Sequence, residues 1–129
     1  MKILVKGKVN GIVLKTNMPI NFLGTVNKNT GIISDKNHEL YNKSIKDSVL
    51  VFPSGVGSSV GAYTIYSIKT NNTAPSAMIC QKADLTVASG CALSNIPLVI
   101  VSYKEFSSLQ NGQKISLDTE SENSILIIQ

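Results

Sequence analysis

The sequence predicts an α+β domain with a layered β/β/α arrangement, and three observations support this. Short apolar runs rich in β-branched residues, such as residues 49–52 and 98–101, outnumber the one clear helical pattern at residues 58–70. No linker or repeat interrupts the chain, and its 129 residues suit one hydrophobic core. Dominant strands beside few helices are typical of a layered domain. We therefore expect residues 1–129 to form a single domain.

The N-terminal third combines two expected strands with long loops. Residues 2–15 alternate loosely between apolar and polar side chains and contain Asn10-Gly11, which predicts two short strands around a turn. Residues 16–31 are rich in turn-forming residues, and long irregular segments of this kind often carry function. We expect residues 32–48 to continue as a surface excursion.

The central third contains the clearest elements. Residues 49–52 form a continuous apolar run, which indicates a strand buried on both faces, and residues 77–80 predict the next strand. Residues 58–70 predict a helix that ends at Asn71-Asn72. The stripe that this helix buries is expected to consist of Ala62, Ile65, Tyr66 and Lys69, with Ile68 beside it.

The C-terminal third begins with an ambiguous segment. Residues 84–95 contain apolar residues that fit a strand, and Gly90 is expected to break a helix there. The elements after it are expected to be a core strand, a short helix and the two strands of a closing hairpin, at residues 98–101, 102–109, 112–117 and 124–128.

Charge and hydropathy exclude two classes of partner. The net charge is +4, but all 12 basic residues are scattered lysines, whereas nucleic-acid-binding surfaces cluster their charges and often use arginine. Lys15, Lys36 and Lys43 are expected to be solvated. The longest apolar runs fall far short of the roughly 18 residues that span a membrane, and the N-terminal stretch is too short for a signal peptide. We expect no nucleic-acid or membrane partner and a cytoplasmic location.

The two cysteines and the single histidine are not expected to form a metal site. Cys80 and Cys91 are spaced neither as a CxxC pair nor as a zinc motif. Cys80 ends an apolar run, which indicates a buried, reduced thiol. Two thiolates cannot hold an iron–sulfur cluster alone. His38 lies among polar residues and is expected to be exposed. We therefore expect this chain to bind no metal or cofactor by itself.

The most informative local pattern is the turn Gly57-Ser58-Ser59, which joins a buried strand to the predicted helix. A serine where a helix begins is commonly its N-cap. The same position offers backbone N–H groups and the positive end of the helix dipole, which can stabilise an anion or a serine alkoxide. Ser58 is therefore a candidate base as well as a candidate cap, and Ser59 can fill either role.

Six short motifs occur in order along nearly the whole chain, followed by the dipeptide Ile96-Pro97. The motifs are residues 19–24 (PINFLG), 29–33 (NTGII), 38–40 (HEL), 50–55 (LVFPSG), 57–61 (GSSVG) and 73–77 (TAPSA). In this order and at these spacings they resemble the swivelling small subunit of the aconitase X group, especially its archaeal members. The chain departs from the pattern at Val56 and Val60, where relatives or aconitase itself carry arginine.

This resemblance implies a fold, an activity and a partner. The fold would be a swivelling β/β/α domain like the mobile domain of aconitase. A separate aconitase-like large subunit would carry a [4Fe-4S] cluster and form a heterodimer with this chain. The pair would be a hydro-lyase acting on a phosphorylated hydroxy acid. It would convert (R)-5-phosphomevalonate to trans-anhydromevalonate 5-phosphate in isoprenoid synthesis.

The resemblance also implies which residues form the site. Ser58 would be the catalytic base, and backbone N–H groups of the turn would stabilise its alkoxide. A shared active site requires residues 16–31, 54–59 and 71–76 to converge on the face that docks on the large subunit. The backbone donors would be the N–H groups of Ser59 and Val60. The expected substrate-binding residues are Gly57, Ser59, Phe22, Gly24 and Pro75.

Three alternatives remain open from the sequence. Bacterial aconitase X proteins that dehydrate cis-3-hydroxyproline would share both fold and serine. Phosphohistidine carrier domains share the swivelling fold, and Ile96-Pro97 with the strands after it is similar to their C-terminal part. A carrier needs its histidine before that strand, however, and residues 83–95 contain none. A non-catalytic interaction domain is the third alternative.

Overall fold

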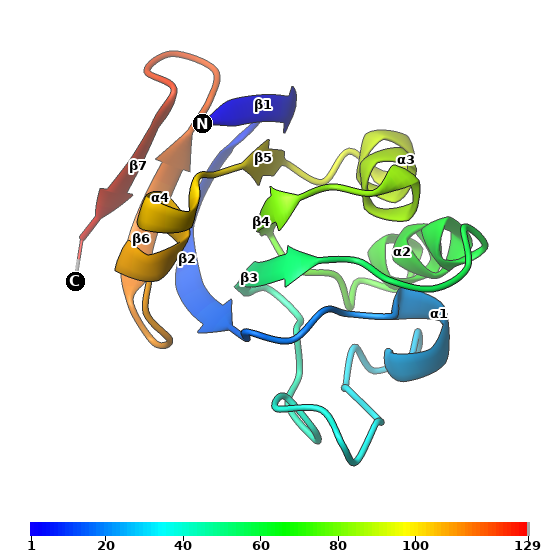
Figure 1. Ribbon diagram of the computed structural model, residues 1–129. Helices are drawn as coiled ribbons and strands as arrows, with labels where there is room; N and C mark the ends of the chain where they lie inside the picture. The colour runs from blue at the N-terminus through cyan, green and yellow to red at the C-terminus, as the bar shows by residue number, and fades with distance from the viewer. Residues whose placement is uncertain (129) are drawn as a thin grey trace.

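A computed structural model describes residues 1–128, which form one seven-stranded sheet and four helices. The strands lie in the order β1-β5-β4-β3-β2-β6-β7 (Figure 1). Their bounds are Lys2–Val5 (β1), Lys8–Lys15 (β2), Val49–Ser54 (β3), Ala77–Lys82 (β4), Leu98–Ile100 (β5), Lys114–Asp118 (β6) and Ser124–Ile127 (β7). The helices are Phe22–Thr25 (α1), Gly61–Thr70 (α2), Leu85–Ser94 (α3) and Tyr103–Ser108 (α4).

The sheet is mixed and curled, which produces the expected β/β/α layering. Strands β2, β3, β4 and β5 are parallel, whereas β1, β6 and β7 join antiparallel. Figure 1 shows α1, α2 and α3 together on one side of the central strands, with α4, β6 and β7 on the other. Two apolar clusters fill the spaces between these layers. One includes Phe52 and Ile65 beneath the helices, and the other includes Val51 and Ile115 between the β-layers.

The central strands confirm the interpretation of their apolar runs. Residues 49–52 are fully buried, and their side chains alternate between the two clusters, as a pleated strand requires. Strand β4 does the same over residues 77–80. Removing these side chains from water contributes roughly 1.5–3 kcal/mol for each large one. The two strands that lead to and flank the Gly-Ser-Ser turn are therefore anchored in both apolar clusters.

The first two strands differ from the expected hairpin. The chain breaks at Gly7 rather than at Gly11, and Gly11 pairs with Ile115 inside β2. Strand β1 pairs with β5 instead of β2. Gly7 packs closely on Pro97, where a Cβ would lie 2.2 Å from the ring. Its N–H donates to the Thr119 hydroxyl at 2.8 Å. These are contacts between distant segments, which the local pattern cannot reveal.

Helix α2 starts three residues later than predicted and buries a different stripe. Its buried residues are Gly61, Thr64, Ile65 and Ile68, while Tyr66 and Lys69 are exposed. The buried positions still follow the helical i, i+3, i+4, i+7 spacing, but the stripe is rotated from the one expected. The helix ends at Asn71, as predicted.

The ambiguous segment 84–95 is a helix, α3, and Gly90 does not break it. Asp84 caps the helix by accepting the Val87 N–H at 3.3 Å. Gly90 faces α2, and a Cβ at this position would lie 2.7–3.1 Å from three atoms of Ile65. The close approach of the two helices therefore requires glycine. Tertiary packing offsets the helix propensity that glycine lacks, which is about 1 kcal/mol.

We expect the substitution Gly90→Ala to lower the free energy of unfolding by about 1–2 kcal/mol. Overpacking against Ile65 costs about 1–3 kcal/mol, and the better helix propensity of alanine recovers at most about 1 kcal/mol. Urea unfolding followed by circular dichroism measures this change. The exposed neighbour Ser89→Ala serves as the control and should not destabilise the chain. An unchanged or higher stability of Gly90→Ala would contradict the close packing of α2 on α3.

Residues 32–48 are packed against the domain rather than being a surface excursion. Ile33, Leu40 and Ile45 are nearly or fully buried in the cluster beneath the helices. His38 is only 7% exposed, contrary to expectation. Its Nε2 lies 3.0 Å from the Pro19 carbonyl oxygen and its Nδ1 accepts the Leu40 N–H at 3.1 Å. This pattern places the proton on Nε2, so the imidazole connects two loops instead of serving as an exposed base.

The C-terminal elements were predicted correctly. Strand β5, helix α4 and the β6–β7 hairpin all form where expected. Helix α4 begins with a capping box, in which Ser102 accepts the Glu105 N–H at 3.1 Å and Glu105 accepts the Ser102 N–H at 3.0 Å. Lys15 is not solvated as expected, because its Nζ donates to the carbonyls of Phe106 and Leu109 at the end of α4.

Candidate functional site

The candidate site lies at the carboxyl edge of the parallel strands, where β3 leads into α2. This edge is the usual ligand-binding position of open α/β sheets. The turn between β3 and α2 is held to the preceding loop, since Ile20 forms a bridge with Gly55 and its carbonyl accepts the Val56 N–H at 3.0 Å. The first turn of α3 also lies here, because the Thr86 hydroxyl donates to the Ser58 carbonyl at 3.2 Å. The predicted convergence of residues 16–31 and 54–59 is therefore present near Ile20.

Glycine is required at two positions in the turn. Gly57 has φ of +99°, and a Cβ there would lie within 3.0 Å of the Asn21 side chain. A Cβ on Gly55 would lie 2.7 Å from both an Asp84 oxygen and a Val87 methyl. The turn thus packs closely between the loop before α1 and the start of α3. This packing fixes the backbone from which Ser58 projects.

Ser58 is exposed, and its Oγ already accepts one backbone hydrogen bond. The donor is the Val60 N–H at 3.1 Å. This was one of the two donors expected for a serine alkoxide. For the other, the Ser59 N–H, the structure shows no acceptor among residues 1–128. A backbone N–H directed at Oγ stabilises negative charge on that oxygen more than it stabilises the neutral hydroxyl.

Neither serine is the side-chain cap of α2. The N-cap residue is Val60, which makes no side-chain capping bond. The N–H groups of Ala62 and Tyr63 donate instead to the backbone carbonyls of Ser59 and Val60, at 3.1 and 2.9 Å. The first turn of α2 also contains no acidic side chain. The positive end of the helix dipole is therefore not neutralised by an acidic side chain of α2 itself, which favours an anion beside Ser58.

Of the predicted substrate-binding residues in the first loop, Phe22 is buried and Gly24 is exposed. Phe22 is 1% exposed and packs edge-on against Phe52, with ring centroids 5.9 Å apart, so it belongs to the core beneath the site. Gly24 is exposed in α1, and its N–H donates to the Asn21 side chain at 3.2 Å. Asn21 is also the side chain against which Gly57 packs. Gly24 is therefore near the turn, whereas Phe22 supports it from below.

Pro75 lies at the opposite end of the sheet from Ser58, so one part of the predicted convergence is wrong. It precedes β4, whose first residue, Ala77, is level with the first residue of β3. The ten residues of α2, about 15 Å long, separate it from the Gly-Ser-Ser turn. Residues 71–76 contact the far end of the 16–31 loop, where the Thr73 hydroxyl donates to the Lys28 carbonyl at 3.0 Å.

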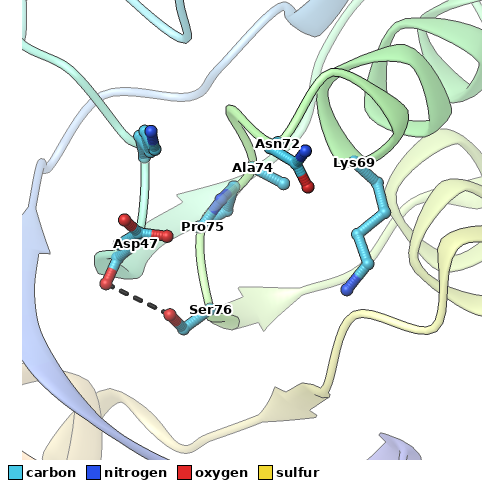
Figure 2. A pocket seen from close by; sticks show the side chains of 7 residues that line it. Asp47, Lys69, Asn72, Ala74, Pro75 and Ser76 are labelled. Carbon is cyan, nitrogen blue, oxygen red and sulfur yellow. Dashed lines mark hydrogen bonds between the residues drawn. The ribbon is translucent and has the colours of Figure 1, made fainter.

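Pro75 instead lines a separate open cavity of about 230 Å³. Figure 2 shows Pro75 and Ser76 at this cavity with Asp47 opposite them and Lys69 from the end of α2. The Ser76 hydroxyl donates to the Asp47 carbonyl at 3.1 Å. The motif at residues 73–77 therefore joins two loops at the starting edge of the strands.

Both cysteines are buried in the apolar cluster beneath the helices, as the sequence indicated for Cys80. Burial, together with the nearby Asp84 carboxylate, raises the pKa of the Cys80 thiol to about 12. Burial also raises the pKa of the Cys91 thiol, whose Sγ lies 3.6 Å from the Met78 sulfur. Thiols of this kind are poor metal ligands, because ligation requires the thiolate. Among residues 1–128, no group of three or more potential ligand side chains is placed to hold a metal ion.

Sequence reasoning missed the apolar side chains that surround the serine. Leu23, Val56, Val60 and Leu85 are between 48% and 73% exposed; we call these four residues the apolar rim. A Cβ on Gly61 would lie 3.0 Å from Thr86 and 3.4 Å from the Leu23 backbone, so their segments meet around the turn. Each is a single apolar residue in a loop or helix start, and only the fold brings them together.

None of the helices in residues 1–128 is long and apolar enough to cross a bilayer. The longest, α2 and α3, have ten residues each, about half of what a membrane span needs.

The fold and the Gly-Ser-Ser turn at its edge are those of a swivelling domain of aconitase type. The chain belongs to the aconitase X swivel domain family, whose model matches residues 1–127. It is 42% identical over 118 residues to the phosphomevalonate dehydratase small subunit of Thermococcus kodakarensis, covering 92% of this chain and 87% of the relative. It is also 42% identical over 114 residues to the protein of that name from Methanosarcina acetivorans, covering 88% and 79%.

Two solved structures share the whole fold. The crystal structure of Thermococcus kodakaraensis aconitase X in its holo form superposes with a TM-score of 0.93 at 39% sequence identity, covering 99% of this chain and 95% of that one. The solution structure of a UPF0107 protein gives a TM-score of 0.89 at 33% identity, covering 99% and 96%. The predicted family and the predicted α+β swivelling fold are thus confirmed.

Proposed function

We propose that this chain is the small subunit of a two-subunit hydro-lyase that dehydrates (R)-5-phosphomevalonate to trans-anhydromevalonate 5-phosphate. The relatives named as phosphomevalonate dehydratase small subunits match most of the chain. The observation that carries the chemistry is the exposed Ser58 Oγ, which accepts a hydrogen bond from the Val60 N–H beside the N-terminus of α2, whose first turn has no acidic side chain. That arrangement suits a serine that becomes an alkoxide.

Ser58 is proposed as the base of this elimination. Its oxygen takes the proton from the carbon next to the substrate carboxylate, and the electron pair of that C–H bond forms the carbon–carbon double bond. The hydroxyl leaves from the neighbouring carbon. A serine hydroxyl is a weak base, so the reaction depends on stabilisation of the alkoxide by the Val60 N–H and the dipole of α2. Gly57 would allow the turn that holds both groups.

The other predicted site residues differ in how close they lie to Ser58 and in whether they are exposed. Ser59 and Gly24 are exposed, so both would be open to contact with the substrate. Phe22 supports the loop from the core and would act by positioning it. Pro75 has no contact with substrate in this proposal, because α2 separates it from Ser58.

A large subunit is proposed to complete the site. Ser58 stands exposed among the apolar rim, and a dehydration of this kind needs a site closed to water. The rim would dock on the partner and exclude solvent from the serine. We place the [4Fe-4S] cluster on that partner, where it would supply a Lewis acid for the departing hydroxyl. We further propose that the chain acts as one swivelling domain in the cytoplasm.

Reconstitution tests the proposed function. The chain and an aconitase-like large subunit with its cluster are mixed, and the product of 5-phosphomevalonate is followed by mass spectrometry. We expect turnover by the complex and none by either subunit alone. The chain alone, incubated with iron and sulfide, should develop no cluster absorbance. If the complex turned over cis-3-hydroxyproline and not 5-phosphomevalonate, the proposed substrate would be wrong. A complex that forms but turns over neither compound would indicate a non-catalytic interaction domain.

A further inference from the structure

Lys82 is the last residue of β4 and the only lysine on the two central strands, β3 and β4. The parallel register places its Cα beside that of Ser54, the residue at which β3 ends. Adjacent strands lie about 4.8 Å apart. The four Cα-to-Cα steps from Ser54 to Ser58 can extend over at most about 14 Å. Lys82 therefore lies at the carboxyl edge of the sheet, on the strand next to the one that leads into the Gly-Ser-Ser turn.

The side chain of Lys82 lies on the face of the sheet that α2 and α3 cover. Along β4, Met78 and Cys80 belong to the same apolar cluster as Ile65 and Val87 of these helices. Side chains two residues apart in a strand share a face, so Lys82 continues this series at the exposed end of the strand. Its ammonium group stands on a flexible four-carbon stem. It can therefore reach the edge where both helices begin.

The charge of Lys82 has no carboxylate partner within residues 1–128. The ion pairs found there join the N-terminus to Glu105 and Lys8 to Asp118. The acidic residue nearest in sequence, Asp84, instead accepts the Val87 N–H as the cap of α3. The chain contains no arginine, so a cation for this edge must come from a lysine or from the partner.

We propose that Lys82 binds the phosphate group of the substrate. This inference rests on the proposed function, because it requires a phosphorylated hydroxy acid at Ser58. A phosphate monoester carries a charge of about −1.5 to −2 at pH 7, and lysine binds phosphate as a point charge. The phosphorylated end of 5-phosphomevalonate is several bonds from the carbon that loses its proton. The substrate therefore needs two separate contacts, which Ser58 and Lys82 provide on adjoining segments.

The variant Lys82→Ala, in the complex with the large subunit, is expected to raise KM for 5-phosphomevalonate by about 10- to 100-fold, the range for a lost hydrogen bond to a charged group. The kcat should stay within about 3-fold, because the contact is made in both ground and transition states. Lys82→Arg should restore most of the affinity, and the neutral Lys82→Gln should not. Thermal unfolding of each variant verifies that the complex remains folded.

Two fragment ligands identify which substrate group Lys82 holds. In calorimetric titration, the Kd of n-propyl phosphate should be higher for the Lys82→Ala complex than for the unmodified complex, by the same factor as the rise in KM. The Kd of butyrate should be the same for both complexes. Weaker binding of butyrate alone would assign Lys82 to the carboxylate and overturn the proposal. Lys69→Ala, at the far end of α2, is the matched control and should alter neither ligand.

These measurements separate the two proposals. If the unmodified complex fails to dehydrate 5-phosphomevalonate, the proposed function is wrong, and the comparison of n-propyl phosphate binding still decides the role of Lys82. If turnover is normal while KM and n-propyl phosphate affinity are unchanged in a folded Lys82→Ala complex, only the assignment of Lys82 is overturned. Failure of the unmodified complex to bind n-propyl phosphate also overturns that assignment.

Discussion

Replacing Ser58 with alanine is expected to lower the turnover of the reconstituted complex by at least about 100-fold, the usual contribution of a general acid–base group. The substitution removes the proposed proton acceptor, whereas Gly57 still allows the backbone conformation of the turn. Only one hydrogen bond of an exposed turn, from Val60 N–H to Oγ, disappears from the folded state, so stability should fall by no more than about 1 kcal/mol. Steady-state kinetics and thermal unfolding measure the two effects separately.

The matched control is Ser59→Ala, one residue along the same turn. Since Ser59 does not cap α2 through its side chain, this substitution should change stability by less than about 0.5 kcal/mol. Its rate should fall less than that of Ser58→Ala. A complex that is active with Ser58→Ala and inactive with Ser59→Ala would show that Ser59 is the base. Full activity of both variants would place the base on the large subunit.

Replacing Leu85 with aspartate is expected to weaken the pairing of the two subunits by at least about 30-fold in Kd. Leu85 is 73% exposed at the first position of α3 and belongs to the apolar rim around Ser58. Truncating a hot-spot residue near the centre of an interface costs about 2 kcal/mol or more, which is a factor of about 30, and a desolvated carboxylate adds to that cost. A negative charge in the first turn of a helix is favourable, so the chain itself should fold normally.

Leu93→Lys supplies the control on the same helix. Leu93 is 60% exposed near the C-terminal end of α3, far from the turn, and a positive charge is favourable there. Both variants thus exchange an exposed leucine for a charge that suits its helix end. Analytical ultracentrifugation should show normal pairing for Leu93→Lys and weakened pairing for Leu85→Asp. The reverse result would place the docking surface at the other end of α3.

Local sequence patterns were sufficient where an element's environment is encoded in consecutive residues. The apolar runs of β3 and β4 predicted strands buried on both faces, because such strands need no polar alternation. The C-terminal hairpin was likewise predicted from turn residues between short apolar segments. The Gly-Ser-Ser turn was found because glycine beside hydroxyl residues, between a strand and a helix, is a local signal. The family resemblance added the role of Ser58.

Other features depended on contacts between segments far apart in the chain. Gly90 counts against a helix locally, yet α3 forms because only glycine lets it approach Ile65 on α2. His38 is surrounded in sequence by polar residues, but its ring lies buried between two loops. Lys82 ends an apolar strand and has no distinguishing pattern around it in the sequence, and only the parallel register sets it beside Ser54. In each case the neighbour that matters is distant in sequence.

The sequence by itself therefore determined the class of fold, the family and the identity of the candidate base. The tertiary structure alone decided which predicted residues share the edge with Ser58 and which, like Pro75, lie at the opposite edge. The physical reason is that parallel strands place all their carboxyl ends on one side, and a residue before a strand lies on the other. Which loops meet is thus set by strand order and register, which depend on packing of the whole chain.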